Sequence, residues 1–151
     1  MIKIICVGKI KEKFYRDAID EYLKRLSKYT KISIMEVDDI DYSNPEVSMQ
    51  KEKDLILKYV DVKDYIITLE IEGQKYNSMD LSKKIDKILS INPNITFIIG
   101  GSYGLSLDIK KLSNMKLSFS DLTFPHQLFR IMLLEQIYRS YKILNNESYH
   151  K

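Results

Sequence analysis

The chain has 151 residues, of which 44% are hydrophobic and 30% charged, a composition typical of one globular domain with its own core. The formal net charge of +3 does not indicate a strongly basic arm, and one cysteine with two histidines can form neither an internal disulfide nor a usual His/Cys metal cluster. No apolar run is long enough for a membrane span or a signal peptide, so we expect a cytoplasmic protein, with Cys6 as a small core residue and no indication of a metal site.

Hydrophobic periodicity predicts alternating strands and helices in the first two thirds of the chain. The expected strands are Ile2–Val7, Ile32–Val37 and Tyr65–Ile71, the last of which should end at Glu72-Gly73. The expected helices are Lys13–Tyr29, Glu46–Val60 and a helix that Ser78 caps and that stops before Pro93. The first helix should turn one apolar face to the core, made of Phe14, Ala18, Ile19, Tyr22, Leu23 and Leu26.

A strand without a polar face, Ile95–Ile99, leads directly into a loop that holds three of the five glycines, Gly100, Gly101 and Gly104. Such a strand is typical of the centre of a sheet. Ligands of open α/β sheets bind beyond the carboxyl ends of the strands. The glycines fit two interpretations, a loop that approaches a ligand and a tight turn with no ligand.

The C-terminal third is expected to contain a short helix from Ser106 to Leu112, a last strand Met115–Ser120 and a helix from Pro125 to about Leu144. The long helix is apolar on more than one side, which a homodimer interface explains most simply. The alternative is a helix buried deeply in its own core. Together, the elements predict a single α/β domain over residues 1–151, with a parallel sheet covered by helices on both faces.

Positive charge is concentrated near the N-terminus. Residues 1–31 hold nine lysines and arginines and four acidic residues, a local charge of +5. A basic face of this kind suits an RNA backbone, and it is equally common on a solvated helix.

Several separated segments, in the same order, resemble the SPOUT class of methyltransferases and, within it, the ribosomal RNA large subunit methyltransferase H family. They are Ile4–Lys9, Thr68–Gly73, Phe97–Leu105, Leu117–His126, Glu135–Arg139 and Ser148–Lys151. The resemblance implies an α/β fold with a C-terminal trefoil knot, an obligate homodimer and S-adenosyl-L-methionine as methyl donor. It further implies methylation of N3 of a pseudouridine in helix 69 of 23S ribosomal RNA on the assembled ribosome.

The same resemblance implies where the site lies. Its cofactor pocket would be formed by Leu69, Gly100, Phe119, Ser120, Asp121, Leu122, Thr123 and Phe124. Leu69 and Leu122 could hold an adenine between them, and Gly100 would leave space for the donor. The active site would be completed across the dimer by Arg139, Tyr149 and His150.

The implied roles of these residues leave alternatives open. Arg139 could bind a phosphate. His150 could act as general base for the proton on N3, or orientation of the reactants could supply most of the rate. His126 is expected to hold its loop rather than to take part in chemistry.

Two other functions fit parts of the sequence less well. A nicotinamide-dependent dehydrogenase would carry a glycine fingerprint after the first strand, and the segment Val7–Ile10 lacks it. A ribosome-binding protein without chemistry fits the basic N-terminal region, but it leaves the glycine loop and the tail unexplained.

Overall fold

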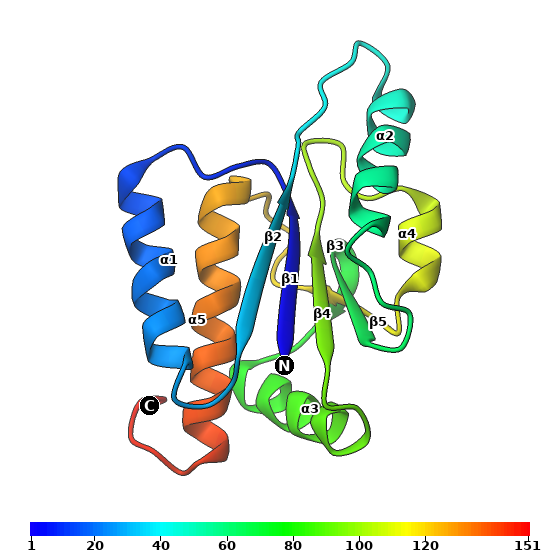
Figure 1. The fold of residues 1–151 in the computed structure, drawn as a ribbon. Helices are drawn as coiled ribbons and strands as arrows, with labels where there is room; N and C mark the ends of the chain where they lie inside the picture. The colour runs from blue at the N-terminus through cyan, green and yellow to red at the C-terminus, as the bar shows by residue number, and fades with distance from the viewer.

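The computed structural model describes residues 1–151, which form one five-stranded sheet with helices on both sides (Figure 1). The strands are β1 (Ile2–Val7), β2 (Ile32–Val37), β3 (Tyr65–Lys75), β4 (Ile95–Ile99) and β5 (Met115–Ser118). The helices are α1 (Lys13–Leu26), α2 (Pro45–Leu57), α3 (Ser78–Ile91), α4 (Leu107–Leu112) and α5 (His126–Leu144). No helix is long and apolar enough to cross a membrane.

The sheet is entirely parallel and has the strand order β2-β1-β4-β3-β5. Strand β4 occupies the middle, where Ile95 lies between Ile2 of β1 and Tyr65 of β3. Every residue of β4 is buried. The prediction of a central strand that leads into the glycine loop is therefore confirmed.

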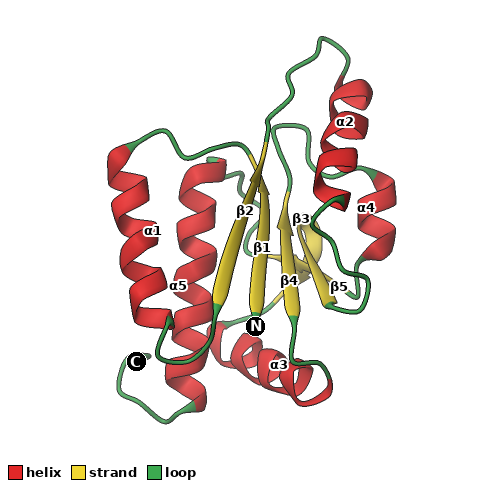
Figure 2. Cartoon of the chain, viewed as in Figure 1, coloured by secondary structure: helices red, strands yellow, loops and turns green.

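Helices cover both faces of the sheet, as the sequence predicts (Figure 2). Apolar residues of α1, α3 and α5 pack with Ile4, Phe97 and Leu117 on one face. Helices α2 and α4 contribute Ile56 and Ile109 to a smaller core on the other face. Cys6 belongs to the larger core, and burial raises the pKa of its thiol to about 12, as expected of an inert packing residue.

Two helices end earlier than predicted, α1 at Leu26 and α2 at Leu57. After α1, the Ser27 hydroxyl donates to the Lys24 carbonyl oxygen, and Tyr29 leaves the helix to stack on Tyr141 at a ring separation of 5.5 Å. Tyr29 is therefore an apolar contact of the loop rather than a continuation of the helical stripe.

One predicted detail of helix α1 and one of helix α3 are wrong. Phe14 is 65% exposed and packs beside Tyr15, with ring centroids 4.5 Å apart, so it does not join the core face. Asn77, not Ser78, caps α3: its side-chain oxygen accepts from the Asp80 N–H at 2.8 Å. The Ser78 hydroxyl instead donates to Gln136 of α5 at 3.0 Å.

Strand β3 continues to Lys75, four residues past its predicted end, because Glu72-Gly73 forms part of a bulge. Leu117 of β5 lies opposite both Leu69 and Gln74, so the residues between them are displaced from the ladder. A Cβ atom on Gly73 would lie 2.8 Å from backbone carbons of Lys116 and Leu117, so only glycine fits this close approach. Strand β5 ends at Ser118, two residues before its predicted end.

Candidate active site

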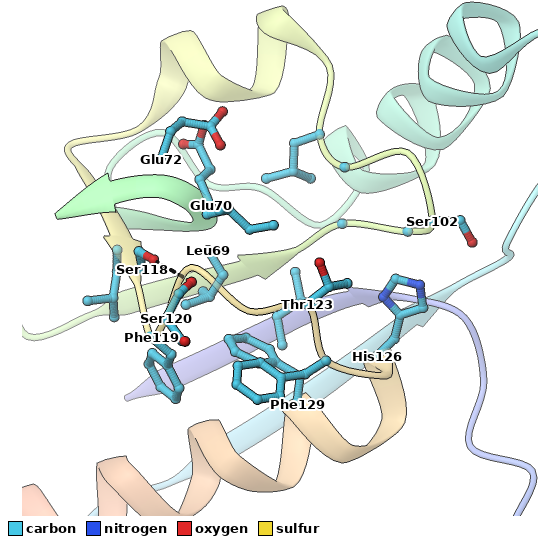
Figure 3. A pocket seen from close by; sticks show the side chains of 18 of the residues that line it. Leu69, Glu70, Glu72, Ser102, Ser118, Phe119, Ser120, Thr123, His126 and Phe129 are labelled. Carbon is cyan, nitrogen blue, oxygen red and sulfur yellow. Dashed lines mark hydrogen bonds between the residues drawn. The ribbon is translucent and has the colours of Figure 1, made fainter. Parts of the chain in front are cut away.

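A cavity of about 450 Å³ lies beyond the carboxyl ends of the central strands (Figure 3). Its walls are the β3 bulge after Leu69, the glycine loop Gly100–Leu105, the loop after β5 and the first turn of α5. This volume, with a lining that combines apolar and polar residues, is within the range of pockets that bind small molecules.

The glycine loop folds tightly on itself and also lines the cavity. Gly101 and Gly104 form an antiparallel bridge, and Gly104 adopts a φ of +80°. A Cβ atom on Gly100 would lie 2.8 Å from the backbone carbon of Gly104, so the absence of a side chain at Gly100 lets the loop close rather than leaving open space for a ligand. The turn is therefore tight, as both interpretations of the glycines expect, and it lines a cavity that a ligand could enter.

The loop after β5 is organised by Ser120. Its carbonyl oxygen accepts from the Ser118 hydroxyl and its own hydroxyl accepts from the Leu122 N–H, each at 3.1 Å. This turn leaves the Leu122 side chain 70% exposed at the edge of the cavity. An exposed leucine here is available to cover a ligand.

Aromatic rings form the side of the cavity next to α5. Phe129 packs against Phe119 and Phe124, with ring centroids 4.9 and 6.1 Å away. His126 also lines the cavity, in the first turn of the helix. Its role as a holder of the loop remains a prediction.

Seven of the eight residues expected in a cofactor pocket line this cavity. They are Leu69, Gly100, Phe119, Ser120, Leu122, Thr123 and Phe124. Asp121 does not line the cavity, because its carboxylate is 80% exposed and pairs with Lys75 at the end of β3. This ion pair connects the loop to the strand that carries the bulge.

Charged side chains that the sequence did not single out also line the cavity. Lys110 of α4 donates to Glu72 at 2.8 Å, and its ammonium lies 3.4 Å from the nearly buried Glu70 carboxylate. Alternation along β3 places Glu70 and Glu72 on one face of the strand, but only the fold shows that Lys110 of α4 meets both carboxylates.

Arg139, Tyr149 and His150 lie together in a second cluster on α5 and the tail. Glu135 accepts from Arg139 Nη2 at 2.7 Å and from the Tyr149 hydroxyl at 3.0 Å. Arg139 Nη1 lies 3.2 Å from His150 Nδ1, and its guanidinium stacks over the Tyr149 ring. Burial, then the hydrogen bond to Glu135, raises the pKa of Tyr149 to about 12. Glu135 is not among the predicted site residues, although its position four residues before Arg139 is the spacing of a helical ion pair.

The tail is tied to the domain rather than free. Glu147 accepts hydrogen bonds from Lys142 at 2.7 Å, from Tyr29 at 2.8 Å and from Lys28 at 3.2 Å. These donors, Lys142 first, lower the pKa of the Glu147 carboxyl to about 2. Tyr149 and His150 are thus presented at a defined position on α5.

Within one chain, the second cluster does not reach the cavity. None of its residues lines the cavity. Phe129, which does line it, precedes Arg139 by ten residues on the same helix, which corresponds to about 15 Å along the axis. The structure therefore assembles the two predicted groups of site residues at separate places.

Comparison with known proteins agrees with this geometry. A family model described as a predicted SPOUT methyltransferase matches residues 1–150. The chain belongs to the SPOUT methyltransferase family. It is 46% identical to the ribosomal RNA large subunit methyltransferase H of Caldicellulosiruptor saccharolyticus, with 100% of both chains covered. It is 49% identical to the protein of the same name from Clostridium botulinum, with 99% of both chains covered.

Solved structures show the same fold at low sequence identity. A Haemophilus influenzae protein described as a probable methylase family protein aligns with a TM-score of 0.56 and 13% identity, covering 99% of this chain and 70% of that one. The Aquifex aeolicus tRNA (m1G37) methyltransferase aligns with a TM-score of 0.52 and 18% identity, covering 91% and 69%. The SPOUT cavity at the carboxyl ends of β3, β4 and β5 is thus the candidate active site of a methyltransferase.

Proposed function

We propose that this SPOUT protein methylates large-subunit ribosomal RNA with S-adenosyl-L-methionine, at N3 of a pseudouridine in helix 69 of 23S RNA on the assembled ribosome. The observation that carries the proposal is the cavity beyond β4, which seven of the eight expected cofactor residues line. Two relatives that align over 99 to 100% of their length are named ribosomal RNA large subunit methyltransferase H, and this name supports the substrate class.

The residues of the cavity fit this cofactor. Leu69 and the exposed Leu122 offer apolar surfaces for an adenine, and both line the cavity. The bent loop between Ser118 and Phe124 supplies backbone N–H and C=O groups that can read the base edge and the ribose. When bound, S-adenosyl-L-methionine supplies a methyl group on a positively charged sulfur.

The chain's own residues would position the acceptor. Arg139 is a candidate for binding an RNA phosphate through its guanidinium. His150, with its imidazole exposed at the end of the tail, is a candidate base for the N3 proton. Both need to lie near the cavity, and they do not do so within one chain.

A homodimer would bring the two groups together, with the tail of one chain over the cavity of its partner. Two observations support it besides the separation of the groups. Leu128 on α5 is 36% exposed, and Ile131 and Met132 on the same helix are only half buried. Sedimentation at working concentration should show a dimer, and a monomer there would contradict this part of the proposal.

We also propose that the chain contains the C-terminal trefoil knot that its family resemblance implies. Joining the two termini of the folded protein would trap such a knot in a ring. After denaturation, this ring should have a smaller hydrodynamic radius than a ring closed from the unfolded chain. Equal radii would argue for an unknotted chain.

The decisive experiment for the function is methyl transfer from labelled S-adenosyl-L-methionine to whole ribosomes and to naked ribosomal RNA, each with and without pseudouridine at the target. We expect label only on ribosomes that contain pseudouridine at the target. Ribosomes lie in the cytoplasm, so this protein would act there. Label on naked RNA as well would remove the requirement for an assembled surface. No label on any substrate would leave the second candidate, a ribosome-binding protein without chemistry, which the basic region of residues 1–31 would serve.

A further inference from the structure

Three charged side chains line the cavity: Glu70, Glu72 and Lys110. Two carboxylates and one ammonium leave one negative charge in excess on this wall. The other titratable side chains of the lining are those of Tyr103 and His126. Any small molecule in the cavity is therefore bound beside an acidic wall that is incompletely neutralised.

Hydrogen bonds hold the wall in place. Thr68 donates to Glu70 Oε2 at 2.6 Å, and Lys110 donates to Glu72 Oε1 at 2.8 Å. Glu70 Oε1 lies 3.4 Å from the Lys110 ammonium but receives no hydrogen bond, although the Glu70 side chain is only 3% exposed. Figure 3 shows the Glu70 and Glu72 carboxylates close together on one side of the cavity.

Lys110 and Glu72 remain charged at neutral pH. The hydrogen bond to Glu72 raises the pKa of Lys110, and the same bond lowers the pKa of Glu72. The Lys110 ammonium thus serves two carboxylates, and Lys116, which does not line the cavity, adds a weaker attraction to Glu72. The excess charge lies beside a concave cavity, where screening by water is weaker than at an open surface, while Glu72 itself keeps 65% of its side chain exposed.

We propose that the wall formed by Glu70, Glu72 and Lys110 selects the cationic methyl donor over the neutral product of methyl transfer. This inference rests on the proposed function. During transfer, the methyl group leaves the sulfonium without the electrons of the S–C bond, and the sulfur keeps that pair as a thioether. The acceptor nitrogen supplies the pair for the new bond and loses its proton to a base or to solvent. The small molecule in the cavity therefore loses one positive charge, and with it the attraction of the wall.

The size of the selection follows from Coulomb's law. For a separation assumed to be roughly 8 Å, one unit of charge in a medium with an effective dielectric constant of roughly 20 to 80 changes affinity by roughly two- to thirtyfold. Weaker binding of the neutral product would favour its exchange for fresh donor after each turnover.

The test measures the Kd of S-adenosyl-L-methionine and of S-adenosyl-L-homocysteine by calorimetry on the full-length protein, and compares their ratio among variants. Glu72→Gln should reduce the preference for the cation by roughly twofold or more, and Glu72, whose side chain is 65% exposed, can be replaced without disturbing the core. Lys110→Gln should increase the preference, because it removes the positive charge. Asp86→Asn is the matched control, since Asp86 is an exposed acid on α3, which lies near the amino ends of the strands (Figure 1).

Opposite shifts for Glu72→Gln and Lys110→Gln, with no shift for Asp86→Asn, would support selection by charge. Equal ratios in all variants, or a reduced preference in Lys110→Gln, would overturn it while leaving the proposed function intact. Failure of the unmodified protein to bind either compound, with ribosomes present, would overturn the proposed function and the inference with it.

Discussion

Arg130 Nη1 donates a hydrogen bond of 3.0 Å to Glu36 Oε2, which ties α5 to the carboxyl end of β2. Arg130 is 1% exposed, and its Nη2 donates to the Gly8 carbonyl oxygen, also at 3.0 Å. Glu36 Oε2 also accepts from the Ile10 N–H at 2.8 Å. One buried guanidinium thus joins the helix that carries the second cluster to strand β2 and to the loop after β1.

Replacing Arg130 by alanine should destabilise the protein by about 3 kcal/mol, because it removes both hydrogen bonds and a buried side chain. Glu36 keeps 35% of its side chain exposed, so the carboxylate left behind can be hydrated and the loss should not be larger. Arg130→Lys keeps the charge without the fork geometry, so its stability should lie between that of the unmodified protein and that of Arg130→Ala. Urea denaturation measures the difference, and an unchanged midpoint for Arg130→Ala would contradict the assigned role.

Glu52 should make stability depend on pH. Burial, followed by repulsion from Asp39, raises its pKa to about 7, while a hydrogen bond from the Ile40 N–H opposes the rise. The folded state therefore binds a proton that the unfolded state has already released, so stability should fall as pH rises from about 5 to 7. Glu52→Gln should remove this dependence and stabilise the protein above neutral pH by about 2 kcal/mol. Denaturation at several pH values tests this, and parallel curves for the two proteins would contradict it.

Two glycines of the same loop should respond differently to alanine. Gly100→Ala places its Cβ 2.8 Å from the Gly104 backbone, so the loop must move, and the affinity for S-adenosyl-L-methionine should fall at least about tenfold. A Cβ on Gly104 meets nothing within 4 Å, and the cost there comes from its φ of +80° alone, about 1 kcal/mol of stability. Calorimetry and denaturation separate the two effects. A larger loss of affinity in Gly104→Ala would show that the packing of Gly100 does not control the cavity.

Mixed dimers test whether the site forms across the interface. Arg139→Ala should inactivate the second cluster, and Leu69→Glu should block the cavity. The homodimer of either variant alone should therefore be inactive. Random mixing should restore about a quarter of the unmodified activity, because half the dimers are mixed and each holds one intact site. Methyl transfer to ribosomes measures the recovery. No recovery, in a mixture shown to have exchanged subunits, would place the complete site in one chain.

The basic surface near α1 should contribute to ribosome binding. Changing Lys11, Lys13 and Arg16 together to glutamate should weaken binding at low salt by at least about tenfold, because phosphate contacts are electrostatic. The control changes Lys83 and Lys87, which are exposed on α3, in the same way. Co-sedimentation with ribosomes at several salt concentrations measures both. Equal binding by the two variants would remove this surface from the docking site.

Local pattern was sufficient for most of the fold. The β-branched run Ile95–Ile99 identified the central strand, because a strand buried on both faces has no polar alternation. Alternation of strands and helices predicted the parallel sheet and its two covered faces, since parallel strands need crossover helices. The errors lie where tertiary contacts override local pattern: Phe14 is exposed, and Tyr29 packs on α5 outside its predicted helix.

The sequence by itself determined the family and predicted seven residues that line the cavity, because both are carried by short segments in a recognisable order. Only the tertiary structure decided that Asp121 turns away to Lys75, that Lys110 of α4 meets Glu70 and Glu72 at the cavity wall, and that the Tyr149 hydroxyl of the tail reaches Glu135. Each of these depends on contacts between segments that are separated in the chain. Periodicity along the sequence carries no information about such contacts, since it reports only which face of an element is buried.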